Sequence, residues 1–186
     1  MRIVGGTLRG RALTPPKSDS TRPTSDRVRE AVFNILAHGA ASLDLTGARV
    51  IDLFAGTGAL GLEAMSRGAA FALFVEEDVS ARAVIRENIE NFGLTGQTKI
   101  FRRDATDLRN SAQHGKFDLA FLDPPYDKGL AVLTLTALTT GDWLTSGATI
   151  VLEDRRDAPI TLPQPFTQLD LRTWGDTQVV FARFNS

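Results

Sequence analysis

The chain has 186 residues, of which 42% are hydrophobic and 23% charged, so it carries enough apolar side chains for one compact core, and we expect residues 1–186 to form a single domain. The absence of cysteine excludes disulfides, thiolate-ligated zinc, iron–sulfur clusters and a cysteine nucleophile. No apolar run approaches the roughly 20 residues that span a bilayer, which predicts a cytoplasmic protein without membrane contact. The net charge of −1 is unevenly spread, because residues 1–30 carry seven basic against three acidic side chains, and such a basic end indicates either a polyanionic partner or a solvated face.

Residues 1–45 are predicted to form a basic arm and a helix. Residues 2–13 favour two small strands around Gly5 and Gly6, and residues 14–25 are rich in proline and polar side chains, as loops are. A helix follows from Asp26 to about His38, with Asp26 as its N-cap or as an acid in its first turn. One face of this helix is apolar, so we expect it to pack on the core.

Residues 46–186 are predicted to alternate between strands and helices. Apolar strands are expected at 48–55, 71–75, 98–102, 117–122 and 148–153, and helices at 60–67, 80–92 and about 129–140. Strands that are so uniformly apolar are buried on both faces, which indicates a parallel sheet with helices on each side. Two further strands around Gly175 and Asp176 form a hairpin. The predicted fold is therefore α/β, with a doubly wound, mostly parallel sheet of seven strands that closes with an antiparallel hairpin.

The residues that follow each strand make up the candidate site, because such sheets bind ligands beyond the carboxyl ends of their strands. Gly56, Gly58 and Gly61 fit the pattern G-x-G-x-x-G between a strand and a helix, where glycines let a ligand approach the backbone; a glycine-rich turn without a ligand is the alternative. Glu76 follows the second strand, where a carboxylate can accept hydrogen bonds from both ribose hydroxyls. Asp104 follows the third strand and suits an adenine amino group, unless it is an N-cap.

Asp52 bears on which nucleoside cofactor the sheet is expected to bind. A dinucleotide would place its pyrophosphate at the N-terminus of the next helix, and a carboxylate on the approach to that turn would repel it. A ligand with a cationic amine and no phosphate suits the position better, and S-adenosylmethionine carries an ammonium, a sulfonium, a ribose and an adenine. The charge therefore favours S-adenosylmethionine over NAD; the alternative is an aspartate satisfied by turn amides.

The fourth apolar strand ends in Leu-Asp-Pro-Pro-Tyr, which suits the binding of an exocyclic amine. Asp123 and Pro124 each precede a proline and are held extended, and the proline rings remove amide donors, so this edge presents only acceptors. Two hydrogen bonds from a planar NH2 group would favour a pyramidal nitrogen whose lone pair can attack a methyl group. Tyr126 can stack on the base. We predict Asp123, Pro124, Pro125 and Tyr126 as catalytic residues; the alternative is a strand that simply ends in a turn.

The absence of cysteine also narrows the reaction. Methylation at C5 of a pyrimidine normally needs a thiolate adduct, and radical methylation needs cysteines for a cluster. The acceptor must therefore be intrinsically nucleophilic, and an amine that is positioned by hydrogen bonds meets this condition.

The chain resembles the class I S-adenosylmethionine-dependent methyltransferases that modify exocyclic amino groups. The resemblance lies in segments 52–64, 75–78 and 122–126. More narrowly, the arm RIVGGTLRGR (2–11), the segment RPTSDRVREAVFNIL (22–36) and the tail WGDT (174–177) are similar to the RsmD-type 16S rRNA guanine-N2 methyltransferases of bacteria. The resemblance implies methyl transfer to a guanine N2 amine in 16S rRNA, within an assembling or assembled small ribosomal subunit. We expect a monomer that needs no metal.

The resemblance also implies roles for individual residues. Cofactor binding is assigned to Asp52, Phe54, Ala55, Gly56, Thr57, Gly58, Glu76, Asp104, Ala105 and Asp123, and substrate binding to Arg9, Arg11, Arg22, Thr24, Arg27 and Tyr126. In such enzymes the loop around Arg22, Pro23 and Thr24 closes over the active site.

Three other functions remain open on the sequence. The first is DNA adenine-N6 or cytosine-N4 methylation, for which residues 1–45 would be a small recognition region. The second is methylation of a protein glutamine, although the resemblance there is to an asparagine at the position of Asp123. The third is a non-enzymatic RNA-binding module, which would leave Asp123 and Tyr126 without a purpose.

Overall fold

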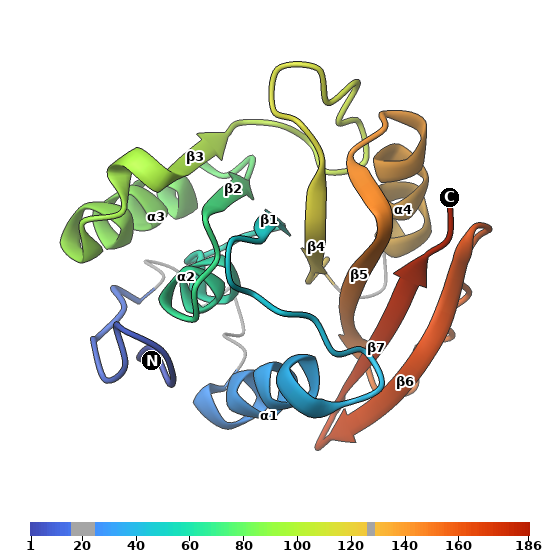
Figure 1. Ribbon diagram of the computed structural model, residues 1–186, viewed down its shortest axis with the longest axis horizontal. Coiled ribbons are helices and arrows are strands. Elements are labelled where there is room, and N and C mark those ends of the chain that lie inside the picture. The colour runs from blue at the N-terminus through green and yellow to red at the C-terminus, as the bar shows by residue number, and fades with distance from the viewer. Residues whose placement is uncertain (16–24, 126–128) are drawn as a thin grey trace.

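The computed structural model describes residues 1–15, 25–125 and 129–186, and these residues contain one sheet of seven strands (Figure 1). The strands are β1 (Arg49–Leu53), β2 (Phe71–Val75), β3 (Thr98–Phe101), β4 (Phe117–Leu122), β5 (Leu144–Arg155), β6 (Phe166–Trp174) and β7 (Thr177–Phe184). Their order is β3-β2-β1-β4-β5-β7-β6, and β7 runs antiparallel to both of its neighbours. The doubly wound sheet and its closing hairpin are confirmed, and strand order reverses between β1 and β4, where such sheets bind ligands.

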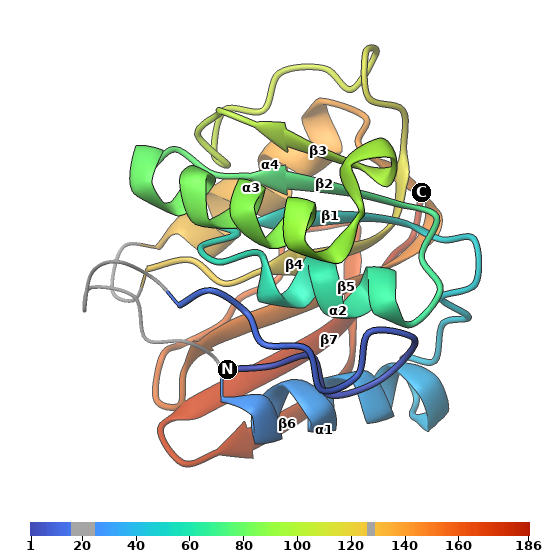
Figure 2. The same ribbon diagram turned by 90° about the vertical axis from the view of Figure 1, so that its left-hand side faces the viewer.

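Helices cover both faces of the parallel strands (Figures 1 and 2). Helices α1 (Asp26–His38), α2 (Ala59–Ser66) and α3 (Val79–Phe92) lie on one face, and α4 (Leu130–Thr140) lies on the other. Phe74 and Phe121 are buried against the first three helices, whereas Leu73 and Leu122 are buried in the cluster that contains α4. Because side chains alternate between the faces of a strand, burial of both faces requires continuous apolar runs.

The helix ends follow local sequence rules. Ser25 is the N-cap of α1, and its side chain accepts a hydrogen bond from the Val28 N–H at 3.2 Å. Asp26 is confirmed as an acid of the first turn, and its predicted role as N-cap is wrong, because the preceding serine takes that position. Asp78 caps α3, and Gly93 ends that helix at a φ of 71°, a left-handed conformation that favours glycine.

The arm differs from the two strands predicted for it. One isolated antiparallel bridge joins Arg2 to Ala12, and the turn between them is closed by a 2.8 Å hydrogen bond from the Gly10 N–H to the Ile3 carbonyl. Most of the predicted loop at 14–25 lies outside the described residues. Strand β5 is also longer than predicted and spans twelve residues, because a register shift against β4 carries its pairing back to Leu144. No helix of the described part of the chain is long and apolar enough to cross a membrane.

Candidate active site

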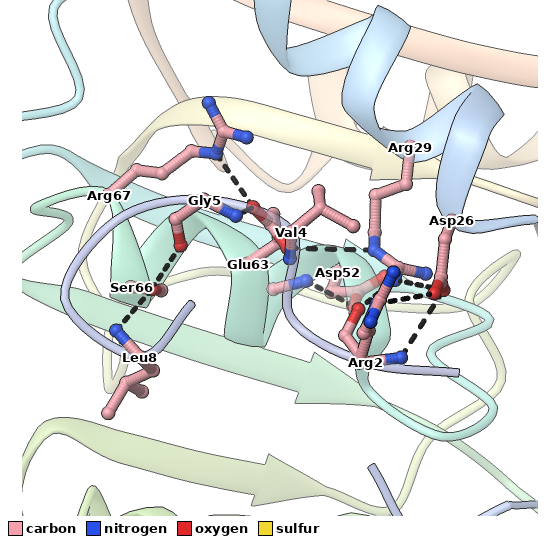
Figure 3. Close-up of polar contacts among 11 residues, drawn as sticks. Arg2, Val4, Gly5, Leu8, Asp26, Arg29, Asp52, Glu63, Ser66 and Arg67 are labelled. Atoms are coloured by element: carbon pink, nitrogen blue, oxygen red, sulfur yellow. Dashed lines mark hydrogen bonds and ion pairs between the residues drawn. The ribbon is translucent and has the colours of Figure 1, made fainter. Parts of the chain in front are cut away.

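Asp52 lies in β1 at the approach to the glycine-rich turn that leads into α2 (Figure 3). Its side chain is 2% exposed, and its Oδ2 accepts a hydrogen bond from the Gly61 N–H at 2.9 Å. Within the described part of the chain Oδ1 has no hydrogen-bond partner. The carboxyl is therefore held by one backbone amide of the first turn of α2, and it still has one oxygen available for a ligand.

The pKa of Asp52 is raised from 3.8 to about 8. Burial is the largest cause, the hydrogen bond from Gly61 lowers the pKa, and the nearby charge of Glu76 raises it. Asp52 is therefore protonated in the ligand-free chain at neutral pH. A cation bound beside it would favour the ionised form, so the site is suited to a positively charged ligand.

The backbone of the turn has a conformation and a packing that favour glycine. Phe54 has a φ of 60°, a conformation that is strained for a bulky side chain, and Gly56 and Gly58 have φ values of 55° and 77°. A Cβ at Gly61 would lie 2.5 Å from the ring of Phe74. Gly58 meets both a conformational and a packing requirement, because a Cβ there would also lie 3.2 Å from that ring, whereas Gly61 meets the packing requirement alone.

Glu76 connects the end of β2 to this turn. Its Oε2 accepts a hydrogen bond from the Gly56 N–H at 2.9 Å, and its Oε1 accepts one from the Asp78 N–H at 2.9 Å. Each carboxylate oxygen can accept a second hydrogen bond, so the group can still bind hydroxyls. The neighbouring Glu77 is exposed, whereas Glu76 is half-buried beside the turn. The geometry therefore favours Glu76 for the predicted ribose contact, which remains a prediction.

Asp104 and Ala105 follow β3. Asp104 is exposed, and its Oδ1 accepts hydrogen bonds from the Thr106 N–H at 2.8 Å and from the Thr106 hydroxyl at 2.7 Å. This is a local Asx turn and not the N-cap considered from the sequence, because no helix begins there. Ala105 is buried in the core cluster on the α4 side of the sheet. A contact with adenine remains a prediction for both residues.

Asp123 ends β4 on the same face of the sheet as Asp52. Asp52 is level with Phe121 in the parallel pair of β1 and β4, and side chains two apart on a strand share a face. The Asp123 side chain is half-buried, Pro124 is buried and Pro125 is exposed. The predicted stacking residue Tyr126 lies outside the described residues.

The pKa of Asp123 is raised well above 3.8, first by burial and then by the charges of Glu153, Asp52 and Asp154. Sequence reasoning did not assign Glu153 or Asp154 to the site. Leu152 is level with Leu122 in the parallel pair of β5 and β4, so Glu153 lies beside Asp123 at the carboxyl edge of the sheet. The signal was present in the sequence, because both acids directly follow an apolar run, as Glu76 does. No cluster of three or more acidic or histidine side chains that could hold a metal ion occurs among the described residues.

The predicted substrate-binding arginines fall into two groups. Arg9 and Arg27 are exposed, have no partner within residues 1–15, 25–125 and 129–186, and line a cavity of about 410 Å³ between the arm and α1. Arg11 is instead in contact with α3, because its guanidinium lies over the Phe92 ring at 4.9 Å and donates a hydrogen bond to the carbonyl of Asn91. Arg22 and Thr24 lie outside the described residues. Of the arginines predicted to bind the substrate, Arg9 and Arg27 are therefore the two described ones whose guanidinium groups are not engaged by other described residues, and Asp26 and Glu30 line the same cavity.

Comparison with known proteins identifies a family and several relatives. The profile of a family described as "Conserved hypothetical protein 95" matches residues 1–183. Ribosomal RNA small subunit methyltransferase D of Escherichia coli is 41% identical over 156 residues, which cover 82% of this chain and 74% of that protein. The protein of the same name from Haemophilus influenzae is 33% identical over 177 residues, with 94% and 89% covered. A solved structure from Escherichia coli, provisionally described as a methyltransferase, has a TM-score of 0.83 at 31% identity and covers 100% of this chain and 98% of that one.

Proposed function

Because the chain belongs to the family described as "Conserved hypothetical protein 95", we propose that it transfers a methyl group from S-adenosylmethionine to the exocyclic N2 amine of a guanine in 16S rRNA. Two relatives that are named as small subunit rRNA methyltransferases support the reaction and the RNA substrate. The observation that carries the proposal is that the carboxyls of Asp52, in β1, and Asp123, directly after β4, lie on one face of the sheet on adjacent parallel strands.

The cofactor fits the residues around the glycine-rich turn. Asp52 offers a buried carboxyl oxygen to the ammonium of the methionine part, and the turn that contains Gly56 and Gly58 follows β1 directly, where a ligand beyond the strand would meet its backbone. Glu76 would bind the ribose, and Asp104 with Ala105 would bind the adenine. When bound, S-adenosylmethionine supplies an electrophilic methyl group. The neutral state of Asp52 before binding costs less burial energy than a charged one, and the cation then stabilises the ionised state.

The target amine would be held by Asp123 and the Pro124 carbonyl. An ionised Asp123 accepts a hydrogen bond from the amine, and the nitrogen lone pair is freed for the N–C bond that forms as the S–C bond breaks. The nitrogen then loses a proton. Because the pKa of Asp123 is raised, its carboxylate takes up a proton more readily than an ordinary aspartate and can receive this one. Tyr126 would stack on the guanine.

The RNA would approach from the side of the arm. Arg9 and Arg27 would contact phosphates, and Arg22 and Thr24 would lie in the loop that closes on the substrate. Arg11 would act on RNA only at its exposed edge, because its guanidinium is already bound to α3. We place the reaction in the cytoplasm, on an assembling or assembled small ribosomal subunit, and we expect the enzyme to act as a monomer without a metal.

The test is methyl transfer from a tritiated donor to naked 16S rRNA, to small ribosomal subunits and to DNA, followed by mapping of the labelled base. Label on a guanine N2 of 16S rRNA supports the proposal. Asp123→Ala should abolish transfer while S-adenosylhomocysteine still binds, and Asp157→Ala, at an exposed position without a contact in the described chain, should remain active. Label on duplex DNA alone, or an Asp123→Ala variant of full activity, would refute it. A protein that binds RNA but gives no heat with S-adenosylhomocysteine would be a binding module.

A further inference from the structure

Asn88 is a buried amide that joins two distant segments of the chain. It lies in α3 with no exposed surface. Its Nδ2 donates a hydrogen bond to the carbonyl of Thr57 at 3.1 Å, and its Oδ1 accepts one from the Thr14 N–H at 2.8 Å. Thr57 belongs to the glycine-rich turn, and Thr14 ends the arm. One side chain therefore ties the arm to the turn.

The position of Asn88 in α3 is otherwise apolar. Its buried neighbours on the helix are Val84, Ile85, Ile89 and Phe92, which pack on the sheet. A buried amide in such a row is unfavourable unless its polar atoms are satisfied, and here backbone groups of the arm and of the turn satisfy them. A second hydrogen bond attaches Thr14 to α3, because the Thr14 hydroxyl donates to the carboxylate of Glu87 at 3.0 Å.

The first part of the arm is attached to α2, as Figure 3 shows. Glu63 accepts hydrogen bonds from the N–H groups of Val4 and Gly5, each at 2.8 Å. The Ser66 hydroxyl accepts one from the Leu8 N–H at 2.9 Å and donates one to the carbonyl of Gly5 at 2.6 Å. These contacts limit the β structure of the arm, since the amides of Val4, Gly5 and Leu8 bind α2 while those of Ile3 and Leu13 pair within the arm.

A buried ion pair extends this attachment to α1. Arg29 and Glu63 both have fully buried side chains, and Nε of Arg29 lies 3.6 Å from Oε2 of Glu63. Arg29 also donates to Asp26 at 2.8 Å and to the carbonyl of Arg2. The arm, α1 and α2 therefore form one hydrogen-bonded unit.

Helices α2 and α3, which both contact the arm, also border the glycine-rich turn. Helix α2 begins at that turn and gives the Gly61 N–H to Asp52 at 2.9 Å, while α3 gives the Asn88 amide to Thr57 at 3.1 Å. Of these two connections, only the one through Asn88 runs from the arm to the turn through a single side chain. Asn88 therefore gives Thr57 of the turn and Thr14 of the arm a common hydrogen-bond partner.

We propose that Asn88 is a positioning residue that couples the nucleoside-binding turn to the arm, so that a ligand in the turn orders the arm and RNA on the arm strengthens binding in the turn. The coupling rests on the proposed function for the identity of the two ligands. Because coupling between two sites is reciprocal, each ligand must raise the affinity of the other by the same factor. The side chain binds no ligand itself and acts through Thr57 and Thr14.

The first test needs no RNA. Amide hydrogen exchange of residues 2–14 is measured with and without S-adenosylhomocysteine in the wild type, in Asn88→Ala and in Asn91→Ala, whose side chain is exposed on the same helix. Saturating S-adenosylhomocysteine should slow exchange in the arm of the wild type and of Asn91→Ala by about fivefold or more, and by less than twofold in Asn88→Ala. Equal protection in all three proteins, or none in the wild type, would overturn the proposal.

The second test measures the coupling itself. The Kd of S-adenosylhomocysteine is determined by calorimetry with and without a 16S rRNA fragment that the wild type methylates. RNA should tighten it by about five- to tenfold in the wild type and leave it unchanged in Asn88→Ala. In turnover, Asn88→Ala should raise the KM for RNA more than it lowers kcat, a split that a merely destabilised protein would not show. A wild-type Kd that RNA does not alter contradicts the coupling even if the RNA is methylated.

A second variant guards against misfolding. If Asn88→Ala does not fold, Thr14→Pro removes the N–H that donates to Asn88, together with the hydroxyl that donates to Glu87, and leaves the sequence of α3 unchanged. Thr14→Pro should lose the protection of the arm by S-adenosylhomocysteine in the same way. A folded Thr14→Pro variant whose arm is still protected like the wild type would refute the role of this contact.

Discussion

Replacing Asp52 by asparagine should stabilise the ligand-free chain at neutral pH and remove its affinity for S-adenosylmethionine. Asparagine has nearly the same size, and its Oδ1 can still accept the Gly61 N–H that Asp52 accepts at 2.9 Å. It carries no charge that burial would penalise. Asp52 is 2% exposed and its pKa is about 8, so the folded chain holds a proton there that the unfolded chain releases above its ordinary value of 3.8.

The sign and size of the effect follow from this difference in pKa. Between about pH 4 and pH 8 the unfolded chain binds fewer protons at Asp52 than the folded chain, so the free energy of unfolding of the wild type falls as pH rises through that window. At about 1.4 kcal/mol for each step of one in pKa, the ceiling is ~5–6 kcal/mol. Because the folded chain can relax around the charge, we expect the variant to gain ~2–4 kcal/mol at neutral pH, or roughly 4–16 °C in Tm.

The assay is urea unfolding of the wild type and of Asp52→Asn at four values from about pH 4.5 to pH 8, with Asp157→Asn as an exposed control. The two stabilities should nearly coincide at the acidic end and diverge steadily toward pH 8, while Asp157→Asn follows the wild type. Calorimetry with S-adenosylhomocysteine should give heat for the wild type and none for Asp52→Asn. Parallel pH profiles, or a variant that is less stable than the wild type at pH 8, would show that Asp52 is not held protonated by burial.

Two further substitutions test the packing around the site. Gly61→Ala should lower stability by ~1–3 kcal/mol and weaken S-adenosylhomocysteine binding, because its Cβ would lie 2.5 Å from Phe74 and 3.1 Å from Asp52. Gly96→Ala, where a Cβ would meet nothing within 4 Å, is the control for thermal melts, and equal losses in both would contradict the close approach. Glu63→Ala should cost ~3–5 kcal/mol, because it removes the buried carboxylate that faces the Arg29 guanidinium and accepts the Val4 and Gly5 N–H groups. A Glu63→Ala loss no larger than that of the exposed Glu90→Ala, measured by denaturant unfolding, would mean that the pair is not buried in solution.

The sequence could predict those parts of the site that local patterns determine. Asp52, Glu76 and Asp123 each lie in or directly after an apolar strand, and the topology of a parallel sheet then gathers them at one edge. The same rule, applied once more to the apolar run 148–152 of β5, would have added Glu153. Helix limits were also predictable to within a residue or two, because caps such as Ser25 depend on near neighbours.

The remaining features depend on contacts between distant residues. Asn88 and Thr14 are 74 residues apart, and Glu63 and Val4 are 59 apart, so no local period reveals them. A buried polar residue at a helical core position gives only a weak signal, because its partner is unknown until the fold is known. For the same reason the arm was expected to pair with itself in two strands, whereas it forms one isolated bridge and the amides of Val4, Gly5 and Leu8 bind α2. The contact of Arg11 with Phe92 could not be predicted either, since nothing in the sequence distinguishes this arginine from the other arginines of the basic segment.

The direction of β7 determines where the carboxyl end of the chain emerges, and this end differs from the amino end in its distance from the site. Because β7 is antiparallel to β5, Arg183 lies level with Thr149 in the first half of β5, and the Ser186 carbonyl accepts a hydrogen bond from the Ser146 hydroxyl at 2.6 Å. A tether or fluorescent fusion placed after residue 186 would therefore emerge at the edge of the sheet opposite Asp123. One placed before Met1 would begin beside the arm, whose Leu13 N–H bonds to the Met1 carbonyl at 3.1 Å. Surface immobilisation through the carboxyl end should leave access for large RNA particles open, and immobilisation through the amino end should obstruct it.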